Sequence, residues 1–364
     1  MNRRPPLRPR AAASSPHASL RIAPVLSASA EYSLRSLPYP HQADLPRLGQ
    51  PSSQTKFFAD PSANLILTSP NQELGVSRWL QLYRGCELAC PLCSSRWTYE
   101  NLGLFSESDF SRRILVRTSA ATQLEELMRD KNYRAQPLGI GLTFDPYQPA
   151  EHGFRVMREC LELLADARHA VVVFTRSTEL LRDLDLYQKL AGHQSVWVQI
   201  AFTTMQPNQG QAWESQSSPI AERLKMMRTL VQAGVPVSVS LGPIVPGWND
   251  EEIAELLAAT AAHGASHASL NFFELNASSR ARLLEWINRH APSDCPSVLE
   301  WLHQKDRTQL LQSMTRKMPA TLLEQQVQHL FAKECRRHYM RRGHLPLATE
   351  HFLVPRDAQL SLFG

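Results

Sequence analysis

Residues 79–93 read WLQLYRGCELACPLC, a short apolar run that passes directly into three closely spaced cysteines. The run ends at Tyr83, and Cys86, Cys90 and Cys93 follow with the spacing C-x3-C-x2-C. An apolar run of this length that stops at a glycine is typical of a buried strand. This stretch therefore predicts a strand followed at once by a loop that can bind a metal.

Downstream of the cysteines, a short β-branched or aromatic run, a loop and a helical period recur in turn. The predicted strands span residues 79–83, 138–144, 170–174, 196–203, 236–244 and 267–275. The predicted helices span residues 154–167, 179–191, 219–233, 250–263 and 278–290, with an extra helix at 120–131. Six strands that alternate with helices predict an α/β fold with a parallel sheet. Because the units stop near residue 290, short of the eight that close a barrel, we expect a partial (β/α)6 TIM-like barrel.

Single residues mark the ends of several predicted helices. Asn249 stands where an N-cap belongs, directly before the helix at 250–263. Gly234 and Gly264 stand where helix C-caps belong. These positions support the helix boundaries between the later strands.

Outside the repeating units the composition changes. Residues 1–55 are rich in Pro, Ser, Ala and Arg and show no apolar period, which predicts a disordered extension. Residues 56–290 form the predicted core barrel, residues 291–345 a small C-terminal helical appendage, and residues 346–364 an extended tail. The helices expected in the appendage span 297–305, 307–317 and 320–342. A transit peptide has a composition similar to 1–55, but the absence of a clear amphipathic stripe favours a simple tail.

The overall composition is that of a globular protein. The chain has 364 residues, of which 43% are hydrophobic and 20% are charged, and this excludes wholesale disorder. No apolar stretch is long enough to span a membrane. Clustered cysteines indicate metal binding in a reducing compartment, so we expect a cytoplasmic protein.

The net charge of +5 is not spread evenly. Basic residues outnumber acidic ones in 1–50 and again in 316–342, whereas the body between them is mildly acidic. The basic run at 333–342 contains Tyr339 and could contact the phosphates of a nucleic acid. A solvated helix face is the more frequent explanation of such a run.

Three thiolates can hold three corners of a [4Fe–4S] cluster, which has four irons. The fourth iron then stays open to the amino and carboxylate groups of S-adenosylmethionine, whose reductive cleavage yields a 5′-deoxyadenosyl radical. Zinc is an alternative, but it takes a fourth ligand and no histidine lies between His41 and His152. A chance grouping in a buried turn is a further alternative, although Gly85, Glu87 and Pro91 suit a core segment poorly.

Further motifs follow the cysteines in a characteristic order. They are Tyr83-Arg84-Gly85-Cys86, Asn101-Leu102-Gly103, residues 143–149 (TFDPYQP), Thr175-Arg176-Ser177, residues 182–185 (RDLD), Thr203-Thr204, residues 243–250 (PIVPGWND) and residues 359–363 (QLSLF). This order resembles the radical S-adenosylmethionine (radical SAM) superfamily, and specifically its spore photoproduct lyase-like branch of uncharacterised bacterial members. The resemblance implies a [4Fe–4S] cluster, S-adenosylmethionine, and an electron donor of the flavodoxin or ferredoxin type.

The resemblance also implies a cofactor site at the strand ends. Asp145 would contact the ribose hydroxyls or the amino group, with Gln148 on the same loop, and Arg176 would bind the methionine carboxylate through a fork of two donors. The remaining members of this expected site are Thr203 and Thr204 after the fourth strand, and Ile244 and Val245, whose backbone would read the adenine. Both residues also have explanations without a cofactor contact. Asp145 could be a turn residue, since Asp-Pro starts turns, and Arg176 could be a surface arginine.

The sequence departs from the family pattern at three places. Leu92 stands where an aromatic residue usually precedes the third cysteine, and Arg176 stands where this branch often has lysine. Thr143 and Phe144 occupy the stretch in which spore photoproduct lyases carry a cysteine that donates hydrogen. The resemblance therefore supports a lyase-like radical enzyme without specifying thymine-dimer repair.

The substrate is left open by the sequence. The basic ends and the family branch favour a nucleic acid or nucleotide. The acidic body and the missing cysteine favour a small molecule or a protein, including a role as a maturase. A non-catalytic iron–sulfur protein is the third alternative.

Overall fold

The computed structural model describes residues 47–48, 55–60, 62, 64–68, 75–96, 108–214, 216–315 and 320–355. Within them, eight strands form one sheet in the order β12-β11-β10-β9-β8-β7-β4-β3. The strands are β3 (Ile66–Thr68), β4 (Arg78–Leu80), β7 (Leu138–Ile140), β8 (Val171–Thr175), β9 (Val196–Phe202), β10 (Val237–Ile244), β11 (His267–Phe272) and β12 (Arg341–Arg342).

The six neighbouring strands from β4 to β11 are all parallel, as the sequence predicts. β3 adds an antiparallel edge next to β4, and β12 adds a parallel edge next to β11. Within the described residues the two edges do not pair with each other, so the curved sheet stays open. The expectation of a partial TIM-like barrel is confirmed.

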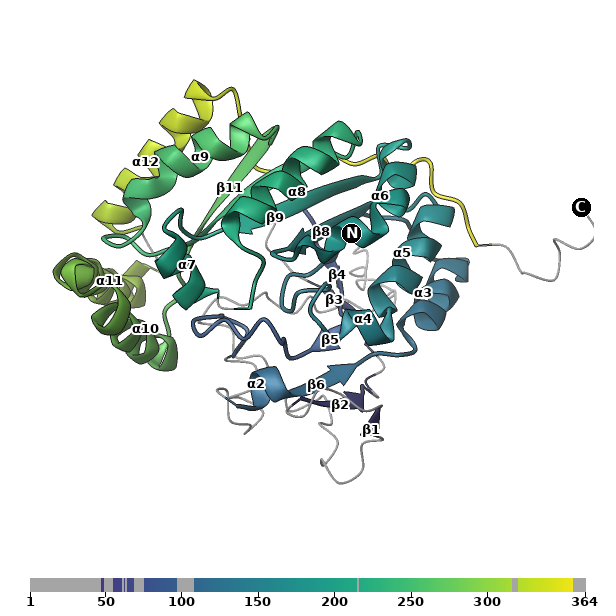
Figure 1. Cartoon of the computed structure of the whole chain (residues 1–364), viewed down its shortest axis with the longest axis horizontal. Coiled ribbons are helices and arrows are strands. Elements are labelled where there is room, and N and C mark those ends of the chain that lie inside the picture. The colour runs from purple at the N-terminus through teal and green to yellow at the C-terminus, as the bar shows by residue number, and fades with distance from the viewer. Residues whose placement is uncertain are drawn as a thin grey trace, which may run out of the picture.

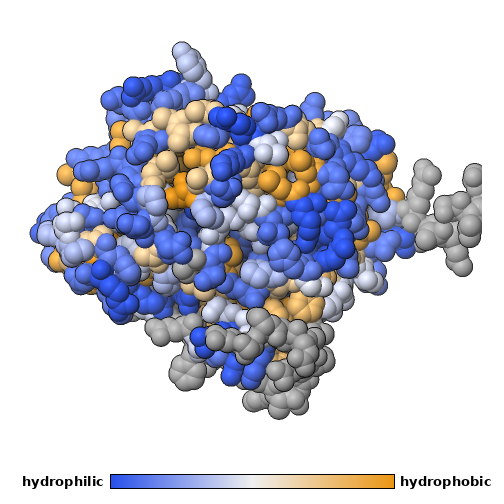
Figure 2. Space-filling model, viewed as in Figure 1, coloured by the Kyte–Doolittle hydropathy of each residue, from blue (hydrophilic) through white to orange (hydrophobic). Residues whose placement is uncertain are grey.

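Helices cover the outer face of this sheet (Figure 1). The covering helices are α3 (Ala120–Arg129), α5 (Val156–Asp166), α6 (Leu184–Ala191), α8 (Ile220–Gln232), α9 (Ile253–Ala262) and α12 (Leu322–Arg337). Shorter elements at the loops are α2 (Asp109–Arg112), α4 (Glu151–Phe154), α7 (Pro207–Trp213) and the 3-10 helices η4 (Thr178–Asp183), η5 (Asp250–Glu252) and η6 (Pro292–Asp294). Gly234 and Gly264 have φ of +80° and +96°, as their role at helix C-termini requires. On this side of the molecule, polar side chains cover most of the surface (Figure 2).

A second, smaller sheet was not predicted. Its order is β1-β2-β6-β5, with β1 at Arg47–Leu48, β2 at Lys56–Ala59, β6 at Arg113–Val116 and β5 at Tyr83–Arg84. The predicted first strand at 79–83 is therefore divided between β4 in the barrel and β5 in this sheet. Apart from β1 and Thr55, the predicted extension at 1–55 lies outside the described residues.

The C-terminal region differs from the sequence prediction in two ways. A single helix, α11 (Cys295–Thr315), replaces the two expected helices, because Asp306 stays helical while its carboxylate pairs with Arg280 at 2.7 and 3.0 Å. α12 ends at Arg337 rather than at residue 342, since Tyr339 takes a φ of +56° and the chain turns into β12. The predicted helix end at 342 is therefore wrong.

The appendage packs on the barrel mouth through a second hydrophobic core. α10 (Ala277–His290) and α11 contribute Trp286 and Trp301 to it, and the barrel loops contribute Trp213 and Trp248. The rings of Trp213 and Trp248 stack with centroids 4.4 Å apart. Leu92, from the cysteine loop, is buried in the same core. The helical appendage and the cysteine loop are therefore packed as one unit.

The lower end of the barrel is filled by apolar side chains. Trp79, Val172 and Trp197 meet there, and Leu345 and Leu347 from the C-terminal tail pack against them. The tail continues in extended form as far as residue 355, and residues 356–364 lie outside the described part of the chain. We call this apolar cluster the plug; among the described residues, it fills the end of the barrel opposite the carboxyl ends of the strands. No described helix is long and apolar enough to cross a membrane.

Asn249 occupies the N-cap position of η5, as predicted, but its side chain makes no capping hydrogen bond. Its side-chain oxygen accepts a hydrogen bond from the Val245 N–H at 2.8 Å. Its amide nitrogen donates to the carbonyls of Thr203 at 2.7 Å and Pro243 at 3.1 Å. The fully buried side chain thus ties the end of β9 to the end of β10.

We predict that Asn249→Ala destabilises the protein by roughly 2–4 kcal/mol, because it leaves three buried backbone groups without partners. Urea unfolding followed by circular dichroism measures the change. Asn288→Ala, at an exposed position on α10, serves as the matched control. Equal stability of the two variants would contradict the bracing role of Asn249.

Candidate active site

The three cysteines lie in the loop that follows β5. Cys86 is buried, Cys90 and Cys93 are half-buried, and none of them forms a disulfide. All three line one cavity of about 320 Å³ at the carboxyl ends of the barrel strands. This is the end at which parallel barrels build their active sites.

The first half of the cysteine loop is held by Gln148, which is 1% exposed. The Gln148 side-chain oxygen accepts a hydrogen bond from the Glu87 N–H at 2.9 Å, and its amide nitrogen donates to the Gly85 carbonyl at 3.2 Å. In return, the Glu87 carboxylate accepts a hydrogen bond from the Ala150 N–H at 2.6 Å. The two loops therefore hold each other on both sides of Cys86. We call these three hydrogen bonds the Gln148–Glu87 clasp.

The second half of the loop is held by Arg96, a buried arginine. Its Nε donates to the Cys90 carbonyl at 2.7 Å and its Nη2 donates to the Ala89 carbonyl at 2.9 Å. The guanidinium lies over the ring of Phe110, 4.6 Å from its centroid. Because the donors meet backbone carbonyls, Arg96 fixes the path of the chain rather than the thiol of a cysteine.

The surroundings of the thiols suit a group that supplies positive charge. Burial raises the pKa of Cys86 well above its usual value, and burial raises the pKa of Cys90 to about 12 although nearby Arg176 lowers it. In the described residues, no three His, Cys, Asp or Glu side chains are arranged around a single metal ion. An iron–sulfur cluster has a separate iron for each thiolate, so its ligands need not converge on one point. Three separate thiols that line one cavity fit the three protein-held corners of such a cluster.

Asp145 lines the cavity, but its carboxylate is already engaged. It accepts hydrogen bonds from the Tyr147 N–H at 2.9 Å, the Thr175 hydroxyl at 2.8 Å and the Arg176 N–H at 2.8 Å. Burial raises the pKa of Asp145, and these hydrogen bonds offset part of that rise. The structure therefore gives Asp145 the role of joining the loop after β7 to the end of β8.

Arg176 extends from the end of β8 into the same cavity. Its Nε donates to the Glu214 carboxylate at 3.0 Å and its Nη2 donates to the Gly242 carbonyl at 3.0 Å. Glu214 also pairs with Arg223. Burial alone would raise the pKa of Glu214, but Arg223 and Arg176 hold it below its usual value. Arg176 is thus a fixed cation that keeps 26% of its side chain accessible.

The other expected cofactor residues do not line the cavity. Thr203 donates to the Gly242 carbonyl at 3.1 Å, and Thr204 donates to the Glu252 carboxylate at 2.7 Å. Ile244 and Val245 are fully buried, and it is Gly242 and Pro243 before them that line the cavity. Gln148 is also absent from the cavity wall. These five expected residues support the site from behind.

Sequence reasoning missed the far wall of the cavity. Gln199, Ser240, Asn271 and Glu274 line it, from β9, β10, β11 and the loop after β11. A signal was present in residues 237–240, whose Val-Ser-Val-Ser alternation places small polar side chains on the inner face of a strand.

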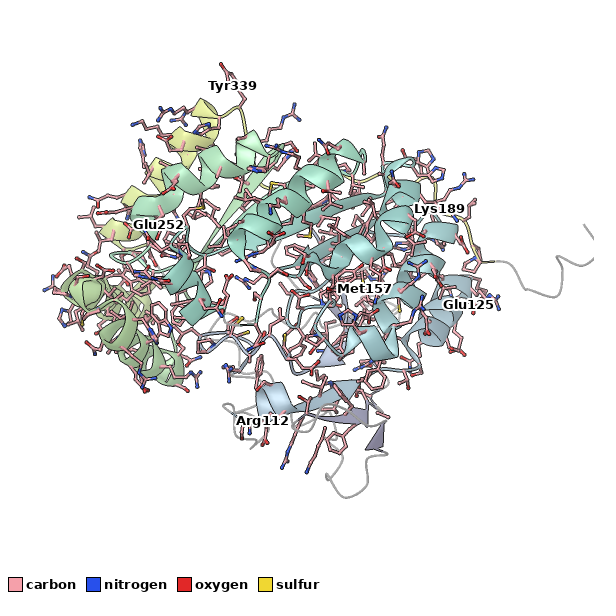
Figure 3. All side chains as sticks on the ribbon, in the orientation of Figure 1. Arg112, Glu125, Met157, Lys189, Glu252 and Tyr339 are labelled. Atoms are coloured by element: carbon pink, nitrogen blue, oxygen red, sulfur yellow. The ribbon has the colours of Figure 1, made fainter. Side chains whose placement is uncertain are left out.

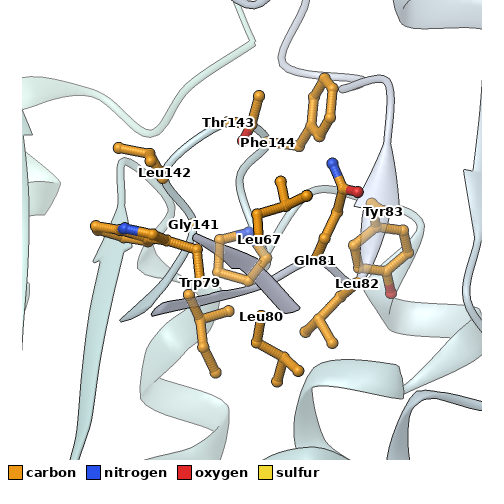
Figure 4. Close-up of a pocket in the computed structure, with 12 residues that line it drawn as sticks. Leu67, Trp79, Leu80, Gln81, Leu82, Tyr83, Gly141, Leu142, Thr143 and Phe144 are labelled. Atoms are coloured by element: carbon orange, nitrogen blue, oxygen red, sulfur yellow. The ribbon is translucent and has the colours of Figure 1, made fainter. Parts of the chain in front are cut away.

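A smaller cavity lies between β3, β4 and β7 (Figure 4). Its volume is about 10 Å³, which holds about one water molecule, and its wall includes Leu67, Trp79 and Leu80. The cysteines do not reach it. It is a packing gap beside the barrel.

Comparison with known proteins identifies the class. Residues 80–259 match the model of the radical SAM superfamily, so this part of the chain is a radical SAM domain. An uncharacterized protein of Mycobacterium bovis is 30% identical over 212 residues, which are 58% of this chain and 62% of that protein. An uncharacterized protein of Methanocaldococcus jannaschii is 24% identical over 184 residues, which are 50% of this chain and 66% of that protein. The chain thus spans less than two thirds of the length of these relatives.

Two solved structures share the fold. Spore photoproduct lyase complexed with dinucleoside spore photoproduct gives a TM-score of 0.50 at 15% identity, covering 65% of this chain and 66% of the other. A mutant of spore photoproduct lyase gives 0.51 at 14% identity, with the same coverage of both chains. At these identities the likeness concerns the fold alone.

We predict that Gln148→Leu loosens the loop that carries Cys86, because it removes the hydrogen bonds of the Gln148 amide to Gly85 and Glu87. A loss of about 1.4 kcal/mol in closing the loop corresponds to a roughly tenfold faster reaction of Cys86 with iodoacetamide in metal-free protein. Labelling rates resolved by peptide mass spectrometry measure this.

Gln188→Leu, at an exposed position on α6, is the control and should leave the Cys86 rate unchanged. Cys160, which is buried in the core of the same barrel, gives an internal reference for general unfolding. If Gln148→Leu leaves the Cys86 rate at the parent value, the clasp does not hold the loop.

Proposed function

We propose that this protein is a radical SAM enzyme that binds one [4Fe–4S] cluster through Cys86, Cys90 and Cys93. S-adenosylmethionine would occupy the iron without a protein ligand. The observation that carries the proposal is that the three thiols of the C-x3-C-x2-C loop line one cavity together with Arg176. When bound, these cofactors would supply reductive cleavage: one electron, which an external donor provides through the cluster, would break a C–S bond of the sulfonium and give methionine and a 5′-deoxyadenosyl radical for hydrogen abstraction.

The residues of this chain would bind and orient the cofactors. Arg176 offers a fixed cation for the methionine carboxylate, since Glu214 holds the guanidinium in place. Leu88, Leu92 and Phe110 add apolar wall beside the cysteines and limit the access of water. We also propose that Asp145 and Gln148 position the loops of the site, with Thr203, Thr204, Ile244 and Val245 behind them.

The proposed function also requires an electron donor and a cellular location in which that donor is present. A donor of the flavodoxin or ferredoxin type would deliver the electron, and such donors fit a cytoplasmic enzyme. Nucleic acid as the substrate draws its support from the basic run at 333–342. However, Arg341 pairs with His267, the first residue of β11, so this run lies at the end of the barrel opposite the cavity. Tyr339 is 95% exposed there and points away from the molecule (Figure 3).

We predict that anaerobic reconstitution of the full chain loads about four irons, and that alanine at any one of the three cysteines abolishes cleavage of S-adenosylmethionine. Each thiolate holds a separate corner, so the other two cannot replace it. Iron analysis and chromatographic detection of 5′-deoxyadenosine measure the result.

Cys295→Ala is the matched control, because Cys295 lies on α11 and does not line the cavity. It should retain both iron and cleavage. Anaerobically purified protein that contains zinc and no iron would refute the cluster assignment.

We predict that Arg176→Ala weakens binding of S-adenosylmethionine by roughly 1.5–3 kcal/mol without lowering the iron content, the usual scale for a hydrogen bond to a charged group. Equilibrium dialysis with the reconstituted protein measures the affinity. Arg129→Ala on α3, whose guanidinium pairs with Glu125 far from the cavity, is the control. An unchanged affinity in Arg176→Ala would remove Arg176 from the cofactor site.

A further inference from the structure

The inner faces of β9, β10 and β11 carry polar side chains in register. Gln199 on β9 pairs with Ser238 on β10, and one step further Ser240 pairs with Ser269 on β11. Asn271 follows two residues after Ser269, on the same face of its strand. A barrel interior is usually filled with branched apolar residues, as it is at the lower end of this one. The polar layer above the plug therefore needs an explanation.

Two hydrogen bonds order this layer but use only part of its capacity. Gln199 donates from Nε2 to the Ser269 hydroxyl at 2.7 Å, and Asn271 donates from Nδ2 to the Ser240 hydroxyl at 2.7 Å. Within the described residues, neither the Gln199 nor the Asn271 side-chain oxygen accepts a hydrogen bond. Gln199 is only 3% exposed and lines the cavity. Both residues line the cavity, so these amide oxygens are open to a ligand or an ordered water there.

The charges around this wall select against phosphate. Arg176 is the one cation among the described residues that line the cavity, and Glu214 and the Gly242 carbonyl already engage it. Glu274 lies at the end of the amide wall, and none of the described residues forms a hydrogen bond or ion pair with its carboxylate. A polyanion would meet repulsion here, whereas a cation would find a partner in Glu274.

We infer that the wall formed by Gln199, Asn271 and Glu274 binds a peptide-like substrate, whose uncharged amide groups meet the two side-chain amides and whose cationic group meets Glu274. This inference rests on the proposed function, in which the cysteine loop occupies the other side of the same cavity. Side-chain amides can donate and accept at once, and therefore match the N–H and C=O of an amide edge. Gln199 and Asn271 set the position of the amide, and Glu274 selects the charge.

Three small probes test the substrate class in the anaerobically reconstituted protein. N-acetyl-lysine N-methylamide carries amides and a cation, N-acetyl-norleucine N-methylamide carries the amides alone, and uridine 5′-monophosphate carries an amide edge with a phosphate. Ligand-observed NMR titrations give their affinities. We expect the lysine probe to bind about tenfold more tightly than the norleucine probe, and the nucleotide to bind most weakly.

Two variants then separate the amide and charge contributions. Glu274→Gln should reduce the affinity of the lysine probe to that of the norleucine probe and leave the norleucine probe unchanged. Asn271→Leu should weaken both amide probes about three- to tenfold. Asn288→Leu, the same substitution at an exposed site on α10, should change neither. Both Glu274 and Asn271 are exposed to the cavity, so folding should tolerate these changes.

Tighter binding of the nucleotide than of the lysine probe would overturn the inference in favour of a nucleic-acid substrate. Equal affinity of the lysine probe for the parent, Glu274→Gln and Asn271→Leu would overturn it as well. Formation of 5′-deoxyadenosine is measured in the same parent sample. Probe binding without that product would count against the proposed function alone, and product without probe selectivity would count against the substrate class alone.

Discussion

A buried glutamine amide holds the loop on which the rest of this site depends. The cysteines lie in a segment with no helix or strand of its own, so side chains from neighbouring elements must fix it. Gln148 does so on both sides of Cys86, and Glu87 returns a hydrogen bond to the loop after β7. Without this clasp, the carboxyl end of the barrel would still bring the loops together, but the spacing of the thiols would not be set.

Much of the barrel follows from periodicity in the sequence, because short strand-like runs alternate with regular helical periods from β8 to β11. The small sheet does not follow, because β2 and β6 are four residues long and pair across a long stretch of chain. Its stability includes a buried ion pair between Asp60 and Arg117, which no local pattern reveals. The charged residues around Asp306 suggest a boundary between two helices. None of them terminates a helix, so α11 continues through this stretch.

Some residues of the candidate site could likewise be predicted from the sequence and others could not. The cysteine spacing is a local signal, and Asp145 and Arg176 were placed at the cavity because parallel strands end at one rim. The expected contact of Gln148 with the cofactor stays a prediction. Its hydrogen bonds to residues 85 and 87 could not be predicted, because they depend on how the two loops pack. The wall formed by Gln199, Asn271 and Glu274 was not predicted, because it depends on which face of β9–β11 turns inward. The Val-Ser-Val-Ser alternation in β10 indicated that face only in part.

The most direct test of this account is electron–nuclear double resonance on the reduced, reconstituted protein with S-adenosylmethionine labelled in its amino and carboxylate groups. Three cysteine ligands leave one iron open, so the labelled nitrogen and oxygen should couple strongly to the cluster. The signals specific to the isotopic labels should disappear when the unlabelled cofactor is used. A spectrum that does not change when S-adenosylmethionine is added would show that no iron is open to it, and would contradict the central claim.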